Sequence, residues 1–287
     1  IAFSSDRFGN IDLFVTKIKG GAPERITYHS ENDILTDWTT DGNLLFETER
    51  TFKQVEWMDE LRKVSANGGT PQMAFNAVGE MGTMSPNKRF IAFVRGYCRT
   101  TREDYRGPAN KDIWIYDTQE DKYTQLTEFE GNEFYPQWGD DNSIYFISAK
   151  PGKYNIYSLA IDENGVKQSE QQVTSFEENG VRYFGVSGDG SKLVLEKGTD
   201  IFTHDLASNK TAKVEFYTPS DYRFDPMEHK TFSGKAENYS VSPDGKYTAF
   251  VVRGEVFVKE NDKEESRSVN LSGHPYRDMD LDWLNDS

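Results

Sequence analysis

Short apolar stretches recur along the chain, and each follows a tight polar turn. The turns are Asp-Gly or related pairs, which supply the positive backbone angles that tight hairpins need. The stretches are rich in β-branched and aromatic residues, which half-buried sheet surfaces prefer. The turns and the stretches after them are 41–42 with 44–46, 87–88 with 90–93, 141–142 with 144–147, 189–190 with 193–195, and 244–245 with 247–250. Each pair predicts a turn that opens a β-strand.

A second unit follows these strands: an alternating strand, a polar turn, and a segment that ends in Leu-Thr, Ile-Thr, Val-Thr or a near equivalent. Such a unit is typical of an antiparallel hairpin with one half-buried face. Its copies begin with strands at 11–18, 60–65, 112–117, 155–161, 200–205 and 255–259. The sequence therefore contains six copies of one repeat.

The spacing of the repeats predicts the architecture. Successive turns lie about 45 to 55 residues apart, which suits four short antiparallel strands and therefore one blade of a β-propeller. We expect an all-β fold, a single six-bladed propeller over residues 1–287. The predicted blades are 1–27 with 275–287 (blade 1), about 28–75 (blade 2), 76–127 (blade 3), 128–174 (blade 4), 175–216 (blade 5) and 217–274 (blade 6).

The two ends of the chain resemble two halves of one blade. Residues 279–286 resemble residues 35–41, which begin a repeat, whereas residues 1–3 resemble residues 91–93, which continue one. We expect the two ends to pair and close the propeller, which removes exposed sheet edges. A longer array of seven or more blades, cut at both ends, is the alternative. Because Ile1 already falls inside a strand pattern, we expect the sequence to be a fragment.

Charge and composition narrow the partners. The formal net charge of −15 repels phosphate backbones and anionic lipid, so nucleic acid is not an expected partner. No apolar run is long enough to cross a bilayer. Cys98 is the only cysteine, which excludes an intrachain disulfide and leaves the compartment open. We expect it to be a surface or packing thiol.

Several motifs resemble a known group of propellers. These are Ser-Pro-Asp-Gly-Lys at 242–246, Ser-Asp-Arg-x-Gly-Asn at 5–10 and Gly-Gly-Ala-Pro-Glu-Arg-Ile-Thr at 20–27. They resemble the repeats of TolB-type translocation proteins, tricorn-type proteases and prolyl-oligopeptidase-like enzymes. Residues 105–116 and 250–257 resemble most the first, six-bladed propeller of tricorn-type peptidases.

This resemblance implies a function. The chain would be a non-catalytic domain of a larger serine peptidase, with the nucleophile and base in another module and no cofactor. Such propellers are thought to guide or filter peptides, so the expected partners are peptides, other domains of the parent peptidase, or a further copy of the parent. The resemblance allows a periplasmic or secreted location, without excluding the cytoplasm. A TolB-like propeller that binds a partner protein is the alternative.

The residues themselves contain little catalytic chemistry. No Gly-x-Ser-x-Gly pentapeptide occurs, which agrees with the absence of a serine nucleophile. His29, His229 and His274 fall in connections between blades on one face, and histidine is a common metal ligand. A metal-dependent lyase is therefore a third alternative, although a histidine at this position also orders its own turn. Two acidic groups, Asp6/Asn10/Asp12 and Asp278/Asp280/Asp282, lack the pattern of a calcium loop, so no metal site is predicted.

Three insertions, at 49–59, 95–111 and 217–235, are predicted to emerge on one face of the propeller, where binding loops usually lie. The second concentrates arginine and tyrosine in an acidic protein, and these residue types are enriched in binding hot spots. The candidate contacts to a peptide carboxylate or an acidic partner are Arg95, Arg99, Arg102, Tyr105 and Arg106. The alternative is that these arginines only pair with nearby acidic side chains.

Overall fold

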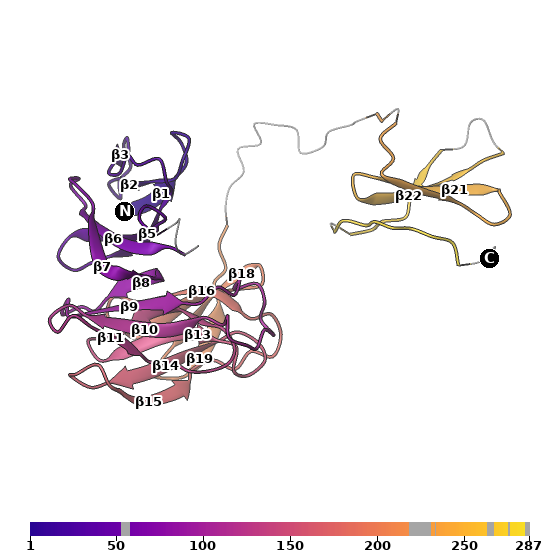
Figure 1. The fold of residues 1–287 in the computed structure, drawn as a ribbon. Coiled ribbons are helices and arrows are strands. Elements are labelled where there is room, and N and C mark those ends of the chain that lie inside the picture. Colours follow the sequence, from indigo (N-terminus) through magenta and orange to yellow (C-terminus); the bar gives the residue numbers. More distant parts are fainter. Residues whose placement is uncertain (53–57, 218–230, 233, 263–266, 275, 285–287) are drawn as a thin grey trace. The chain divides into compact units, whose positions relative to one another are not determined.

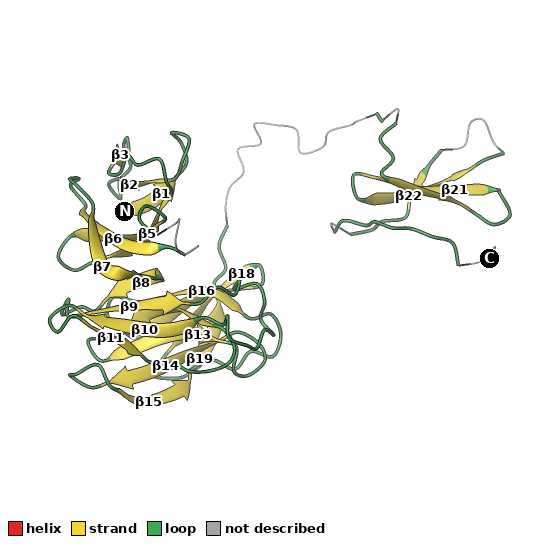
Figure 2. Cartoon of the chain, in the orientation of Figure 1, coloured by secondary structure: helices red, strands yellow, loops and turns green. Residues whose placement is uncertain are grey.

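The computed structural model describes residues 1–52, 58–217, 231–232, 234–262, 267–274 and 276–284. The chain divides into two compact units, Ile1–Tyr217 and Thr218–Ser287, which are described separately (Figure 1). The described residues are strands, turns and loops without a helix (Figure 2). Accordingly, no helix in this part of the chain has the length and hydrophobicity to span a membrane.

The first unit contains five antiparallel sheets, each formed by consecutive strands. The first sheet has three strands and the others four. The strands are β1 (Ala2–Ser5), β2 (Asp12–Val15) and β3 (Glu24–Arg25); β4 (Asp33–Trp38), β5 (Asn43–Thr48), β6 (Glu60–Ser65) and β7 (Gln72–Val78); β8 (Glu80–Met84), β9 (Phe90–Arg95), β10 (Asp112–Asp117) and β11 (Lys122–Gln125); β12 (Glu133–Trp138), β13 (Ser143–Ser148), β14 (Asn155–Ile161) and β15 (Lys167–Gln172); β16 (Val181–Val186), β17 (Lys192–Lys197), β18 (Asp200–Asp205) and β19 (Lys210–Lys213).

The second unit contains one sheet of four antiparallel strands, in the same order as along the chain. They are β20 (Asn238–Val241), β21 (Tyr247–Val252), β22 (Glu255–Glu260) and β23 (Val269–Asn270). The six sheets confirm the predicted all-β repeat. The third strands β6, β10, β14 and β18 even begin and end at the predicted residues.

Within the first unit, the first strand of each four-stranded sheet lies beside the corresponding strand of the next sheet: β4 contacts β8, β8 contacts β12, and β12 contacts β16. Between the sheets lie shared apolar clusters. Leu13 and Phe46 join the first two sheets, and Leu61 and Phe93 join the second and third. Full burial of each such side chain contributes roughly 1.5–3 kcal/mol. Each sheet therefore depends on its neighbour for a covered face.

The Thr that ends each repeat has a structural role. The hydroxyls of Thr27, Thr127 and Thr174 accept hydrogen bonds of 2.9–3.0 Å from a backbone N–H at the start of the preceding strand. Ser272 does the same for Val256 at 2.9 Å. This bond fixes the chain where it leaves one sheet for the next, which explains the recurring motif.

One backbone hydrogen bond links consecutive repeats. Its acceptor is the carbonyl just before the third strand, and its donor lies five residues before the end of the next first strand. The pairs in the first unit are Asp33 to Ile11, Gly79 to Asp59, Glu133 to Lys111, and Val181 to Tyr154, at 2.8–2.9 Å. In the second unit, Asp278 donates to Gly254 at 2.8 Å in the same way. Residues 278–283 thus follow β22 as a first strand follows the preceding sheet.

Two further features give residues 278–283 the character of a first strand, although no strand is assigned there. Asp280 has a φ of 56°, and the matching residues of β8 and β12, Met81 and Tyr135, have φ of 53° and 59°. The indole N–H of Trp283 donates to the carbonyl of Ser240 at 3.2 Å. The indole of Trp138 binds β8 at the equivalent carbonyl at 3.1 Å. The local geometry therefore fits the predicted role of this segment in blade 1.

Closure of the propeller joins the two units and stays a prediction, with a defined register. Met84 pairs with Ile91 and Thr83 with Ala92, so we expect Trp283 to pair with Ile1 and Asp282 with Ala2. Antiparallel partners have Cα atoms close enough for a disulfide. An Ala2→Cys/Asp282→Cys variant should oxidise readily, seen as a mobility shift on a non-reducing gel. The cross-link should stabilise the fold by about 5 kcal/mol in the chain-entropy model.

The matched control is Ala2→Cys with Leu281→Cys, because a shift of one residue turns the second side chain to the opposite face of the strand. Equal cross-linking of both pairs, or of neither, would contradict the predicted register.

A buried charge cluster ties the second sheet to the third. Glu47 on β5 accepts a 2.7 Å hydrogen bond from the backbone N–H of Met81, and Lys111 forms an ion pair with Glu80. Burial raises the pKa of Glu47 to about 7, and the nearby Asp59 adds to this effect. Burial also lowers the pKa of Lys111 to about 8.

The raised pKa of Glu47 predicts a pH-dependent stability. The folded state binds this proton more tightly than the unfolded state, so its stabilisation is complete below about pH 4.5 and is lost as the pH rises through about 7. Glu47→Gln keeps an acceptor for Met81 and removes this loss. We expect the variant to gain stability over the parent between pH 5 and 8, by about 3 kcal/mol at most. Thermal unfolding of both proteins across this range measures the difference, and a constant difference would disprove it.

Candidate functional site

The insertion between β9 and β10, residues 96–111, is tied to its surroundings at several points. Its two arms are joined by a 2.7 Å hydrogen bond from the backbone N–H of Cys98 to the carbonyl of Ala109. Gly107 donates to the carbonyl of Glu130, next to the fourth sheet, at 2.9 Å. Cys98 is buried beneath the loop, so it is a packing thiol.

A buried amide organises the underside of this insertion. Asn132 is fully buried, and its side-chain N–H groups lie within 3.2–3.4 Å of the carbonyls of Arg99 and Arg102 and the hydroxyl of Tyr154. Its carbonyl oxygen accepts from the backbone of Lys111 at 3.2 Å. Since a buried amide without partners is costly, these contacts hold the loop in one conformation.

Two charged side chains fasten the insertion to the connection between β13 and β14. Arg106 donates to the carbonyl of Ala149 at 3.0 Å, and its guanidinium lies over the ring of Phe129 at 4.9 Å. Glu103 accepts a 2.5 Å hydrogen bond from the backbone N–H of Tyr154 and forms an ion pair with Lys153 at 3.1 Å. Arg106 therefore serves the structure of the loop.

The other predicted contact residues differ in their freedom. Arg95 lies over Trp114 at 5.5 Å and Arg102 over Tyr105 at 4.9 Å, both with exposed side chains. The Tyr105 hydroxyl accepts a hydrogen bond from the backbone of the same loop at 3.2 Å. The exposed side chain of Arg99 has no partner among the described residues. Arg99 and Arg102 are thus the cations that this loop presents to solvent.

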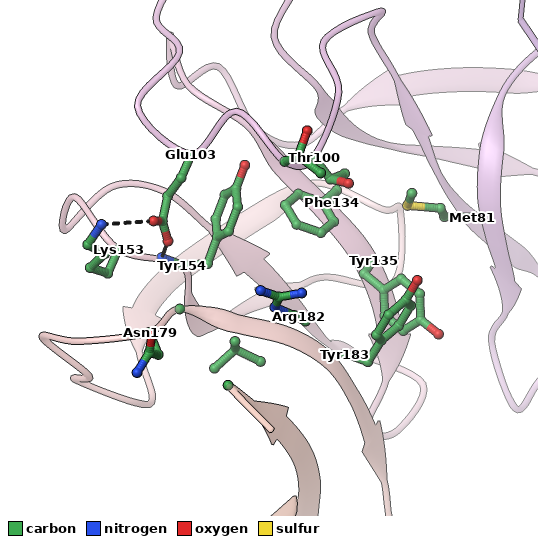
Figure 3. A pocket seen from close by; sticks show the side chains of 14 residues that line it. Met81, Thr100, Glu103, Phe134, Tyr135, Lys153, Tyr154, Asn179, Arg182 and Tyr183 are labelled. Carbon is green, nitrogen blue, oxygen red and sulfur yellow. Dashed lines mark hydrogen bonds and ion pairs between the residues drawn. The ribbon is translucent and has the colours of Figure 1, made fainter. Parts of the chain in front are cut away.

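A pocket of about 410 Å³ lies beside the insertion (Figure 3). Thr100, Thr101 and Glu103 of the insertion form one wall. The other walls come from the strands β8, β12 and β16 and from the connections around Lys153, Asn179 and Gly198. Connections within sheets and between sheets therefore meet at one site, as predicted for the elaborated face.

The side chains that dominate this pocket did not emerge from the sequence. Figure 3 shows the guanidinium of Arg182 in the middle of the pocket, among the rings of Phe134, Tyr135, Tyr154 and Tyr183. Tyr135 and Tyr183 pack edge to face with centroids 5.2 Å apart, and Phe134 and Tyr154 do so at 5.0 Å. Bulges in β12 and β16 interrupt the strand register next to these residues. A bulge changes which face a side chain meets, so alternation along the sequence does not locate them.

The electrostatics of the pocket leave one positive charge uncompensated. Glu103 and Lys153 neutralise each other, and this pairing raises the pKa of Lys153. Burial raises the pKa of Tyr154 to about 12, so the phenol stays neutral. Arg182 has no hydrogen-bond or ion-pair partner among the described residues.

The histidines considered for metal binding order their own turns. His29 Nδ1 accepts from the backbone N–H of Glu31 at 3.0 Å, and His274 Nδ1 accepts from that of Tyr276 at 3.3 Å. His229 lies outside the described residues. The part of the chain that the structure describes contains no group of three or more His, Cys, Asp or Glu side chains arranged for a metal ion. The lyase hypothesis therefore has less support than the propeller alternatives.

The predicted acidic groups also have local partners. Asp12 forms a 2.5 Å ion pair with Arg25. Asp278 accepts a 2.5 Å hydrogen bond from the hydroxyl of Ser272. The alternate positions of Asp278, Asp280 and Asp282 were expected to place them on one strand face, but no strand is assigned to these residues.

Comparison with known proteins places the chain among propellers of one type. The family described as the tricorn protease N-terminal beta propeller domain matches residues 1–210. A tricorn protease homolog from Saccharolobus solfataricus is 23% identical over 250 residues, which cover 86% of this chain and 22% of the relative.

Two solved structures have a similar fold. The crystal structure of the tricorn protease has a TM-score of 0.62 and 22% identity, covering 96% of this chain and 26% of that protein. TolB from Acinetobacter baumannii has a TM-score of 0.59 and 17% identity, with 95% and 63% covered. The chain thus spans about a quarter of the length of the tricorn proteins it matches. With its repeated four-stranded sheets, it belongs to the family of tricorn protease N-terminal β-propeller domains.

Proposed function

We propose that this chain is a non-catalytic, peptide-binding propeller domain that guides or filters peptides for a larger peptidase. The observation that carries the proposal is the fastened insertion 96–111, which presents Arg99 and Arg102 to solvent beside a pocket. In a protein of net charge −15, exposed cations at one site attract acidic groups of a ligand. The family membership supports a role within a peptidase.

The rigidity of the insertion is relevant to this function. Binding loops lose less conformational entropy on association when they are held in one conformation beforehand. Asn132, Arg106 and Glu103 provide such contacts beneath and beside the loop. Capture of a partner protein's segment, as in the TolB-like alternative, would use the same surface.

The proposal predicts that the two exposed arginines contribute to peptide affinity. Arg99→Met and Arg102→Met should each weaken binding of a fluorescent acidic octapeptide by about 2- to 5-fold, because exposed ion pairs contribute about 0.2–1 kcal/mol. The loss should shrink at high salt, since exposed charges are screened. Fluorescence polarisation at low and high ionic strength measures both effects.

Lys210→Met, which removes an exposed cation on the outer strand β19, is the matched control and should leave the affinity unchanged. The proposal would be wrong if the double variant Arg99→Met/Arg102→Met bound the peptide as the parent chain does.

The non-catalytic role predicts a separate result. The purified chain should hydrolyse no peptide, with or without added divalent metal, whereas the parent peptidase should do so. Release of fluorescent product, together with elemental analysis of the chain, tests this. Hydrolysis by the chain, or one bound metal ion per chain, would instead favour the lyase alternative and direct attention to His29, His229 and His274.

A further inference from the structure

The pocket beside the insertion combines one uncompensated cation with apolar walls. The Arg182 side chain comes from the bulged part of β16, and the structure gives its guanidinium no acidic partner among the described residues. The single carboxylate that lines the pocket, Glu103, is occupied by the backbone of Tyr154 and by Lys153. The pocket is therefore suited to a ligand with one negative charge.

The walls specify the rest of the ligand. Phe134 and Tyr154 form one aromatic pair and Tyr135 and Tyr183 another, so an apolar or aromatic side chain would meet ring surface on two sides. Aromatic contacts of this kind add about 0.5–1.5 kcal/mol beyond simple burial. The hydroxyls of Thr100 and Thr101 lie on the insertion wall and offer donors to a ligand oxygen.

The size of the pocket favours the end of a chain. Its volume of about 410 Å³ lies near the lower limit for small-ligand sites, which suits one or two residues better than a peptide that passes through. An α-carboxylate and the side chain of the same residue leave one carbon atom, so both reach a cation and an apolar wall within a small space. Guanidinium binds carboxylate through two parallel hydrogen bonds, which adds geometric selectivity.

We propose that this pocket binds the C-terminal residue of a peptide, with Arg182 pairing with the free α-carboxylate and the aromatic walls holding an apolar side chain. The inference rests on the proposed peptide-binding function and adds which part of the peptide is held and by which residue. It assigns to Arg182 a role distinct from that of Arg99 and Arg102, which act on acidic groups elsewhere in the ligand.

The test compares two peptides of the same sequence that end in phenylalanine, one with a free carboxylate and one with a terminal amide. Isothermal titration with the whole chain should show the acid binding about 10- to 100-fold more tightly than the amide, because a partly desolvated charged pair is lost. Arg182→Met should weaken the acid to the level of the amide and leave the amide unchanged. Arg182→Lys should restore part of the difference.

Arg99→Met is the comparison variant, and it should weaken acid and amide by the same factor. Arg182 is exposed, so its variants should unfold at the temperature of the parent chain, which checks that the fold is intact. A peptide ending in glutamate should bind less well than one ending in phenylalanine, since its side chain places a second negative charge against the rings.

Three outcomes would overturn the inference. Equal binding of acid and amide would reject the C-terminal site while leaving the proposed function in place. Binding of N-acetylphenylalanine as tight as that of the peptide would assign the pocket to small carboxylic acids. Failure of every peptide to bind, whatever its terminus, would remove the proposed function and this inference with it.

Discussion

Burial of apolar side chains between neighbouring sheets is the constraint on which the rest of this structure depends. Each sheet has four or fewer short strands, too few to cover both of its faces alone. Phe46 and Phe93 are fully buried only because the next sheet lies against them. The repeat must therefore place each new sheet beside the last, and the backbone bonds that link consecutive repeats do this at nearly constant length.

The same constraint explains how an irregular loop becomes a site. The insertion 96–111 has no strand of its own, so its conformation depends on polar contacts to the stacked sheets. Asn132 and Glu103 satisfy its backbone and that of the neighbouring connection, and Arg106 reaches across to Ala149. A substitution in the fourth sheet that removed these partners would alter the loop without touching its surface residues. Recognition and fold are thus coupled through a few buried polar groups.

The strands could be predicted from the sequence because each follows a turn with a distinct residue pattern and alternates in hydrophobicity. β10 and β14 show this most clearly, as their predicted and observed limits coincide. The candidate site was only partly predictable. Arg99 and Arg102 stand out by composition, whereas Arg182 and Tyr135 reach the pocket through bulges that have no marker in the alternating pattern. Arg106 shows the opposite error, since a residue that looked like a contact is used to hold the loop.

The distribution of charge gives the two kinds of arginine different consequences. Arg106 is held by three backbone carbonyls and a ring, so its charge is already satisfied by dipoles of the protein. Arg182 lies among aromatic rings without such carbonyls, where a charge is less well solvated than in water. A cation in that setting gains more from an anionic ligand than one on open surface does, because the local dielectric is lower. The pocket, rather than the more conspicuous basic loop, is therefore the place where this acidic domain has most to gain from binding a carboxylate.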